Sequence, residues 1–505
     1  MSNYAEQFTV SRVFGSNMVL QRNERIRIWG WANECQNGRL VCASFMGLRG
    51  EALIENGEWC IEFDGTLPES SAPGNTLTVS GAPGVEYNFE NVLVGDVYMI
   101  IGQSNVRYNL EAIIKGAPEG YPGRDCVITD TENIRLNLSS IHDADGNDIY
   151  PVRGTTELCR DVRNLRGWRL PSEGALEFSA IGYFVAQMLI RKVGNHIPIG
   201  VIEIDADGQA LNMFLPNELA DELGTDELID GVYKGMFHVV PEPSRYVYNH
   251  FIYPFQKFAI CSLVWYQGES DFNDVNAPVF AKNYTAFVTE LRRRFDMNEH
   301  RNFPVFMVEI PSCYPPYEGW PEGELWAYID MARIRCEMGK IPNMLSDCYL
   351  AASSDLWLDD RYWNSLHPYC KYPQAKRLTA MILARRFGIG ELESAAGPQM
   401  TSVTYNGNKA SVAYRYVAEG LTSAASSDIL GFEVKLSDGW HQPEDVREYG
   451  DVNGDGICDT IELSANEEIL GVRYNCKTDN YFPKHVNLCS SEGIPAIAFI
   501  DEKPV

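Results

Sequence analysis

The sequence predicts an α/β protein whose mostly parallel sheet lies between two β-rich regions of the chain. In the middle of the chain, continuous apolar runs of strand length alternate with segments of helical periodicity. This alternation is typical of a parallel sheet covered by helices. Before and after it, short alternating runs are interrupted about every ten residues by Gly, Pro, Asn or Ser, as in small β-sandwiches.

The first β-rich region spans residues 1–90. Runs such as Arg25–Trp31 and Leu77–Val79 alternate between apolar and polar residues and end at turn-forming residues. Strands of this kind bury one face and expose the other. We therefore expect a β-sandwich-like domain here.

The central region, residues 91–395, contains four apolar runs that predict strands buried on both faces. These strands are expected at Val92–Ile101, Ile197–Ile204, Phe258–Tyr266 and Phe303–Ile310. Helical periodicity covers Ala180–Lys192, Tyr284–Phe295 and Pro373–Phe387. Residues 107–176 are rich in Gly and Asp and lack periodicity, so we expect a long loop excursion over the catalytic face.

The third region, residues 396–505, returns to β texture. Strands are expected at Ser402–Tyr405, Ala410–Tyr414, Gly431–Leu436 and Gly471–Tyr474. The chain therefore reads as a β domain, an α/β domain and a second β domain.

Composition excludes several classes of protein. The 505 residues are 45% hydrophobic and 22% charged, which is ordinary for a globular protein. The formal net charge of −27 argues against nucleic acid and against an anionic membrane as partners, because both require basic patches. The sequence does not indicate an oligomeric state.

The amino terminus lacks the basic and apolar segments of a signal peptide, which predicts a cytoplasmic location. A secreted protein whose signal had been removed would read the same way. The 13 cysteines form no C-x-x-C pair, and Cys42 and Cys261 sit in apolar runs. We therefore expect free thiols, with these two buried.

Three short motifs at predicted strand or helix ends suggest nucleophilic chemistry. Gly102–Asn105 (GQSN) follows the first buried strand, so Ser104 would present its Oγ and a backbone N–H beyond the strand end. Gln267 follows another buried strand and carries an amide donor that an oxyanion could use. His367 lies just before a predicted helix. Each motif alone is weak, but together they supply nucleophile, donor and base.

With these motifs in place, the chain resembles the sialate O-acetylesterase family of the SGNH hydrolases. The matching segments are spread in order along nearly the whole chain. They are Asn17–Arg22, Ile28–Trp31, Val94–Val97, Gly102–Asn105, Phe178–Ala180, Pro198–Ile202, Trp265–Ser270, Leu366–Pro368, Gly431–Glu433, Val472–Tyr474 and Gly493–Ala496.

The resemblance implies a flavodoxin-like three-layer α/β/α catalytic domain and a role for four residues. Ser104 matches the nucleophile and His367 the general base. Gly208 matches the residue whose N–H joins the oxyanion hole, and Gln267 matches its side-chain donor. The implied activity is hydrolysis of O-acetyl esters on sugars through an acetyl-enzyme, with no catalytic cofactor.

Two departures from the family pattern bear on this activity. Ser365 stands where the family usually carries an Asp two residues before the His. His367 would then rely on a backbone carbonyl, on Asn364 or on an acid from elsewhere, which leaves a Ser–His dyad, a rewired triad or a weakened enzyme. Asp355, Asp359, Asp360 and Glu269 are the nearest candidates along the sequence. The second departure is at Ala206–Gln209 (ADGQ), which replaces W-G-G-T and brings a negative charge at Asp207.

Residues 451–462 (DVNGDGICDTIE) fit the pattern of a calcium-binding loop. The ligands would be Asp451, Asn453, Asp455, the Ile457 carbonyl, Asp459 and Glu462. Both flanks read as strands rather than helices, so an acidic hairpin is the alternative. Any calcium there would be structural.

Two other functions stay open. The substrate could be an acetylated plant polysaccharide such as xylan or mannan, with aromatic residues of 314–326 stacking on sugar rings. Alternatively, the loss of the Asp at Ser365 could mark a decayed esterase that only binds glycans.

Overall fold

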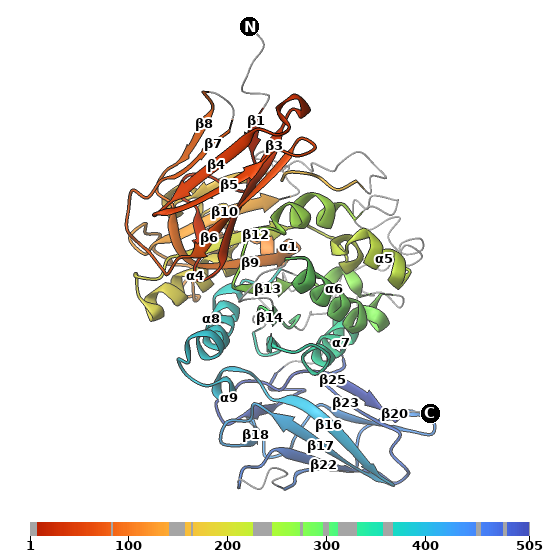
Figure 1. Ribbon diagram of the computed structural model, residues 1–505. Helices are drawn as coiled ribbons and strands as arrows, with labels where there is room; N and C mark the ends of the chain where they lie inside the picture. Colours follow the sequence, from red (N-terminus) through yellow and green to blue (C-terminus); the bar gives the residue numbers. More distant parts are fainter. Residues whose placement is uncertain are drawn as a thin grey trace.

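The computed structural model describes most of the chain. The described residues are 8–81, 84–140, 157–162, 165–225, 245–272, 276–295, 302–311, 331–356, 367–450, 456–477 and 482–503. Three regions follow one another along the molecule, with the α/β region between the two β-rich ones (Figure 1). Among the described residues, no helix has the length and apolarity needed to cross a bilayer.

The central region is built on a mixed eight-stranded sheet. Seven of its strands lie side by side in the order β11 (Leu165–Arg169), β10 (Ile134–Ser140), β12 (Ile199–Asp205), β9 (Leu93–Gly102), β13 (Ser262–Tyr266), β14 (Val305–Val308) and β15 (Cys348–Ala351), and the eighth, β2 (Val19–Gln21), pairs with β9 off this path. Only the β10–β11 pair within this path is antiparallel. From β12 to β15 the order is that of flavodoxin-like folds, and it reverses between β9 and β13.

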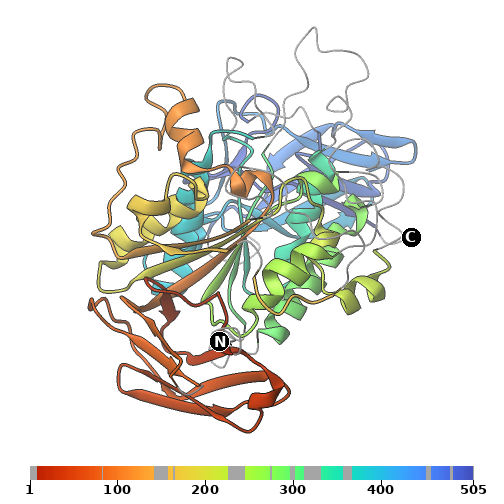
Figure 2. The ribbon, with the colours of Figure 1, turned by 90° about the horizontal axis from the view of Figure 1, so that it is seen from above.

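Helices cover both faces of this sheet, which confirms the predicted α/β class (Figure 2). One face carries α4 (Ala180–Val193) and α8 (Lys371–Ile382), and the other carries α5 (Asn217–Leu223), α6 (Phe280–Arg294) and α7 (Met331–Met344). Residues of β9 alternate between the two cores, because successive side chains of a strand point to opposite faces.

Shorter helices and turns complete the region. They are α1 (Ser104–Arg107), α2 (Leu110–Gly116), α3 (Pro171–Gly174), α9 (Leu392–Ala395), η3 (Leu211–Phe214), η5 (Tyr248–Ile252), η6 (Tyr253–Phe255), η7 (Glu269–Asp271), η8 (Ala277–Val279) and η10 (Leu383–Phe387). The segment 107–176, expected as a loop, contributes β10 and β11 to the sheet edge as well as α2 and α3. Its residues 141–156 and 163–164 lie outside the described part.

The N-terminal β-rich region joins the central sheet. One of its sheets has the order β1 (Phe8–Val10), β3 (Arg25–Ala32), β6 (Glu58–Thr66), and the other has β5 (Leu48–Leu53), β4 (Leu40–Phe45), β7 (Leu77–Ser80), β8 (Glu86–Phe89). A short strand, β2 (Val19–Gln21), instead pairs in parallel with the start of β9. The apolar side chains of this region form one core with the α6–α7 face.

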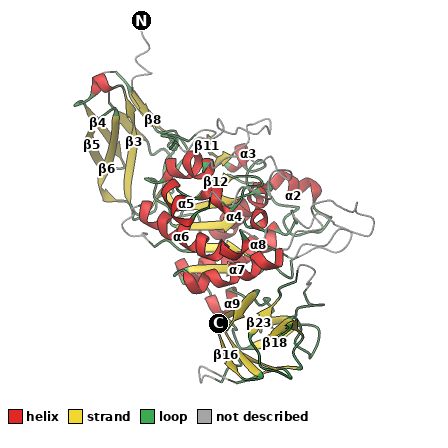
Figure 3. Cartoon of the chain, turned by 90° about the vertical axis from the view of Figure 1, so that its right-hand side faces the viewer, coloured by secondary structure: helices red, strands yellow, loops and turns green. Residues whose placement is uncertain are grey.

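The C-terminal β-rich region has a core of its own and lies at the opposite end of the molecule (Figure 3). Its strands are β16 (Gln399–Asn406), β17 (Lys409–Arg415), β22 (Thr460–Ser464) and β21 (Asp445–Glu448) in one sheet; β20 (Gly439–His441), β19 (Phe432–Leu436), β23 (Gly471–Tyr474) and β25 (Phe499–Glu502) in a second; and β18 (Leu421–Ser423) with β24 (Leu488–Ser490) in a third.

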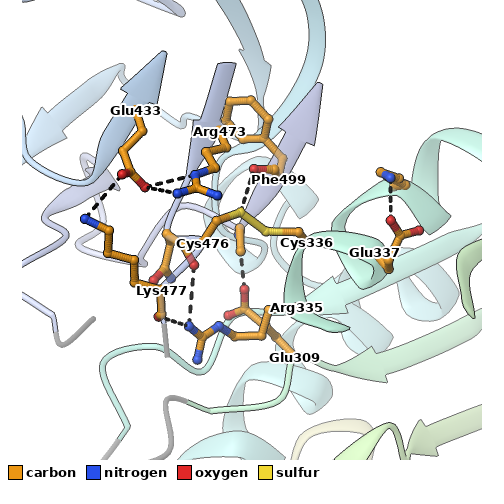
Figure 4. Close-up of a disulfide and its surroundings, with 12 residues drawn as sticks. Glu309, Arg335, Cys336, Glu337, Glu433, Arg473, Cys476, Lys477 and Phe499 are labelled. Carbon is orange, nitrogen blue, oxygen red and sulfur yellow. Dashed lines mark hydrogen bonds and ion pairs between the residues drawn. A yellow bond between two sulfur atoms is a disulfide. The ribbon is translucent and has the colours of Figure 1, made fainter. Parts of the chain in front are cut away.

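A disulfide between Cys336 of α7 and Cys476 after β23 ties this region to the central one (Figure 4). Beside it, Arg335 Nη2 donates to the Lys477 carbonyl at 2.8 Å, and the Ala498 N–H donates to buried Glu309 at 3.1 Å. The expectation of free thiols is therefore wrong for these two cysteines, since their pairing spans 140 residues and leaves no local sequence signal.

Of the two cysteines predicted to be buried, only Cys261 is. Cys42 is exposed, because it alternates with the inward-facing Val41 and Ala43 on β4. The cytoplasmic location stays a prediction.

Candidate active site

The strand ends of the central sheet bring together three of the four predicted site residues. Gly102 at the end of β9 lies in register with Asp205 of β12 on one side and Tyr266 of β13 on the other. Ser104, Gly208 and Gln267 each follow one of these residues by one to three positions. They therefore meet at the carboxyl edge of the sheet, where the strand order reverses and open α/β sheets bind ligands.

The turn that carries Ser104 depends on Gly102. A Cβ at this position would lie 2.1 Å from the Tyr266 carbonyl oxygen and 2.5 Å from Val106, so only glycine allows β9 and β13 to approach so closely. Ser104 then opens the one-turn helix α1 and is half-buried. Its position at a helix start leaves its N–H without an intrahelical acceptor.

Two backbone donors beside the Ser104 hydroxyl are available to a ligand. Within the described residues, neither the Ser104 N–H nor the Gly208 N–H donates a hydrogen bond. Gly208 has φ +65°, in the left-handed region that glycine adopts without strain, and it is half-buried. Partnerless N–H groups at such a turn can stabilise a developing oxyanion.

Gln267 lies at this edge, but both hydrogens of its amide already have acceptors. Nε2 donates to the Gln209 carbonyl at 3.1 Å and to Asp271 at 2.6 Å, and the side chain is fully buried. In this arrangement Gln267 braces the residue that follows Gly208. Its role as a direct oxyanion donor stays a prediction.

His367, the predicted base, lies four residues before Lys371, where α8 begins, and its ring stacks on Tyr108 with centroids 6.4 Å apart. Tyr108 lies one helical turn after Ser104, whose carbonyl accepts its N–H at 2.8 Å. Ser104 and His367 therefore both contact Tyr108, and no hydrogen bond joins Ser104 to His367. Such bonds often tighten only when substrate binds.

The pKa of His367 is lowered to about 4. Burial is the main cause, the positive charge of Lys371 adds to it, and the carboxylate of Asp207 opposes both. Asp207 is itself ion-paired with Arg107. The imidazole is therefore neutral, and able to accept a proton, over most of the pH range.

The described acids proposed from sequence to support His367 have other partners. Asp355 is ion-paired with Arg377 at 2.5 Å, and Glu269 accepts a hydrogen bond from Asn105. Asp359, Asp360 and Ser365 lie outside the described residues, as do the aromatic residues of 314–326. Asp207 is the described carboxylate whose charge acts on His367.

Sequence reasoning missed Lys371, which is fully buried between the two halves of the site. Its Nζ donates to Asn105 Oδ1 at 2.6 Å and to the Pro368 carbonyl at 3.0 Å. Lys371 is the first residue of α8, where the helix dipole disfavours a cation. A lysine at such a position, four residues after the candidate base, was the available signal.

Two buried carboxyl groups lie beneath the site. Burial raises the pKa of Glu269 to about 7, although bonds from its own backbone and from Asn105 oppose the shift. Burial likewise raises the pKa of Asp271 to about 7, against the bonds from Gln267 and Leu211. Neither is exposed, so they shape the site rather than meet substrate.

The predicted calcium loop is described only from Gly456 onward, and the calcium site stays a prediction. Glu462 lies on strand β22, and its carboxylate accepts from Lys409 at 3.0 Å and from Arg447. These two cations lower the pKa of Glu462, Arg447 most. Asp459 accepts a bond from Thr460. Asp451, Asn453 and Asp455 lie outside the described residues, and no metal-binding group of acids, His or Cys occurs in the described part.

Comparison with known proteins confirms the family resemblance. Residues 177–360 match the model of the family described as carbohydrate esterase, sialic acid-specific acetylesterase. Mouse sialate O-acetylesterase is 22% identical over 74% of this chain and 72% of its own length. The human sialate O-acetylesterase is 24% identical over 59% of this chain and 54% of its own length.

The fold as a whole also has a solved counterpart. The crystal structure of XAC1771, described as a novel carbohydrate acetylesterase from Xanthomonas citri, superposes with a TM-score of 0.73. The match covers 98% of this chain and all of the other, at 21% identity. The two chains therefore share the arrangement of α/β and β-rich regions.

Proposed function

We propose that the protein is a serine-dependent carbohydrate O-acetylesterase with an SGNH-type catalytic domain. The observation that supports the proposal is that Ser104 and Gly208, both half-buried and with partnerless N–H groups, follow neighbouring strand ends, while His367 is neutral. Nucleophile, oxyanion donors and base are the groups that acyl transfer requires. The matches to sialate O-acetylesterases support a sugar acetyl ester as substrate.

In the first half-reaction, His367 takes the Ser104 hydroxyl proton while Oγ attacks the acetyl carbonyl carbon. The carbonyl π electrons move to oxygen, and the N–H groups of Ser104 and Gly208 stabilise that charge. Collapse breaks the ester C–O bond, and the imidazolium gives its proton to the departing sugar oxygen. The acetyl group remains on Ser104.

In the second half-reaction, His367 takes a proton from water as the water attacks the acetyl-serine. The second oxyanion collapses, the bond to Oγ breaks, and the imidazolium returns its proton to Ser104. Acetic acid leaves and ionises in solution. Asp207 stabilises the transient imidazolium in both halves, because its charge opposes the cost of protonating a buried ring.

Acetate release tests the proposal and identifies the substrate class. Wild type is compared with Ser104→Ala on O-acetylated sialic acid and on acetylated xylo-oligosaccharides. We expect Ser104→Ala to lose roughly 10⁴-fold or more in kcat, because the nucleophile is removed. Ser437→Ala, at an exposed position of the C-terminal region, is the matched control and should retain full rate.

The two substrates separate the open alternatives. Faster release from sialic acid supports a sialate esterase, and faster release from xylo-oligosaccharides supports a plant polysaccharide esterase. Equal rates would contradict either narrow assignment. Undiminished release by Ser104→Ala would overturn the proposed mechanism.

A groove in the N-terminal region favours glycan binding as a second candidate function. It encloses about 560 Å³ between the β3–β6 pair and residues 253–257, a size that suits one or two sugar rings. Aromatic rings and hydrogen-bonding side chains line it together, as sugar recognition requires. They include Trp29, Trp31, Glu58, Tyr253, Gln256 and Lys257.

Calorimetry with the Ser104→Ala protein tests this candidate without turnover. Binding of xylo-oligosaccharide or sialyl-oligosaccharide that weakens in Trp31→Ala would support it. Identical binding by the Trp31 variant, or no binding by either protein, would exclude the groove as a glycan site.

A further inference from the structure

We propose that Lys371 is a positioning residue that holds the base His367 in register with the nucleophile Ser104. The inference deepens the proposed esterase function and rests on it.

The first support is geometric. The Lys371 ammonium donates to Asn105 Oδ1 at 2.6 Å and to the Pro368 carbonyl at 3.0 Å. Asn105 follows Ser104 directly on α1, and Pro368 follows His367 directly before α8. One cation therefore bonds to the neighbour of each catalytic side chain, across 266 residues of sequence.

The second support is confinement. The Lys371 ammonium lies 5.1 Å from the ring centroid of Tyr266 and 5.3 Å from that of Tyr108, and the side chain has no solvent-exposed surface. Asn105 is held in turn, because its amide donates to Glu269. With no access to water, the ammonium depends on these partners, so the distance between α1 and the His367 turn is fixed.

The third support is charge. His367 faces Lys371 from α8, Asp207 from the loop after β12 and the Tyr108 ring from just after α1. After burial, Lys371 is the larger contributor to the lowered pKa of His367, and Asp207, paired with Arg107, acts in the opposite direction. Lys371 itself faces the Cys370 thiol and Glu269, and burial lowers its pKa to about 8.

These facts predict an unusual pH profile. A carboxylate at position 365 would raise the pKa of His367, but this chain has Ser365. The buried ammonium of Lys371 instead lowers that pKa. The acid limb of kcat/KM should therefore lie near pH 4 rather than near the ordinary histidine value of 6.5. A lysine that only filled space would leave that limb unchanged.

Two substitutions separate the bond from the charge. Lys371→Gln keeps an N–H donor but removes the charge, so the acid limb should move upward with a small fall in kcat. Lys371→Met removes both, so the limb should move upward and kcat should fall roughly 10²-fold with KM little changed. Lys376→Met, exposed on the same helix, is the control and should match wild type.

Asp207→Asn should move the acid limb of kcat/KM in the opposite direction. Removing this carboxylate should shift the acid limb downward, because the negative charge raises the pKa of His367. The same ordering should appear in the ¹³C NMR titration of His367 in histidine-labelled protein, with the resonance assigned by His367→Asn. This readout needs no substrate, so it remains valid if the esterase proposal fails.

The outcomes are distinct. Upward shifts of limb and resonance in both Lys371 variants, with the larger kcat loss in Lys371→Met, support the inference. Unchanged limb, resonance and kcat in Lys371→Gln overturn it, while loss of activity in Ser104→Ala would still uphold the esterase. If wild type releases no acetate from any ester, the proposed function fails and the NMR titration alone decides the charge effect of Lys371.

Discussion

The helix formed by α8 and η10 carries a cation near each end, and the two cations have different partners. Arg386 of η10 bonds to Asp96 of β9, whereas Lys371 at the start of α8 bonds to Asn105 of α1. At the amino end of β9, Asp96 accepts from Arg22 at 2.8 Å and from Arg386 of η10 at 3.3 Å. At the carboxyl end, Lys371 bonds to a neutral amide and a peptide carbonyl instead.

The pKa shifts record this difference. Burial alone would raise the pKa of Asp96, but Arg386 and Arg22 outweigh it and hold the pKa below its usual value. Burial lowers the pKa of Lys371 to about 8, and Cys370 and Glu269 oppose it only in part. Matched charges thus stabilise the fold at one end, and an incompletely matched charge lies at the candidate active site.

Gly102→Ala should have the largest effect on stability, because it disrupts the carboxyl end of β9 without removing a charge. The added methyl would lie 2.1 Å from the Tyr266 carbonyl oxygen, so β9 and β13 would have to separate. We expect a loss of more than about 5 kcal/mol in unfolding free energy, measured by urea denaturation. Gly15→Ala, whose Cβ would meet its nearest atom at 3.8 Å, is the control. Equal stability of the two variants would refute the close approach.

Asp96→Asn removes the matched charge at the amino end. Two guanidinium groups would lose their buried counter-ion, which costs about 3–5 kcal/mol of unfolding free energy. Glu111→Gln breaks the exposed pair with Lys115 and should cost at most about 0.5 kcal/mol. Denaturation curves of the two variants that coincide would show that the Asp96 cluster adds no stability.

Ser365→Asp would add a carboxylate two residues before His367 in the sequence, at the position where the family pattern has an Asp. A neighbouring carboxylate raises the pKa of an imidazole and strengthens it as a base. We expect kcat/KM at pH 7 to rise roughly tenfold, equivalent to about 1.4 kcal/mol. Ser437→Asp controls for added negative charge. An unchanged rate would mean that another group already supports His367.

The pH dependence of stability should also differ between the ends. Between pH 8 and 10.5 the unfolded chain keeps the Lys371 proton that the folded protein has lost, so stability should rise with pH. The rise is at most about 1.4 kcal/mol per pH unit and should vanish in Lys371→Met. Asp96, whose pKa is lowered, should instead cost stability as the pH falls below 3.8. Urea unfolding midpoints measured from pH 8 to 10.5 and below pH 3.8 give the pH dependence of stability for Lys371 and Asp96, respectively.

The sequence predicted the nucleophile side of the site better than its surroundings. Ser104 and Gln267 follow apolar runs, and because parallel strands end at one edge of a sheet, such runs followed by polar residues indicate neighbours. Gly208 is implied only by the family resemblance. The Lys371–Asn105 bond joins residues 266 positions apart, and no local pattern encodes it. The Cys336–Cys476 pair was missed for the same reason.

Strand boundaries show a second limit. The run Phe258–Tyr266 predicted one strand, but β13 starts only at Ser262, because the earlier apolar residues pack under the N-terminal region. In contrast, α4 covers Ala180–Val193, nearly as predicted, although its first eight residues are buried all round rather than on one face.

Trapping the acyl-enzyme tests the central claim most directly. The protein is mixed with an activated acetyl ester, quenched in acid within the first turnover, digested and mapped by mass spectrometry. The account predicts one acetyl group on the peptide that contains Ser104, and none on that peptide in Ser104→Ala. Acetate release at full rate with no acetyl on Ser104, or with the acetyl on another residue, would contradict it.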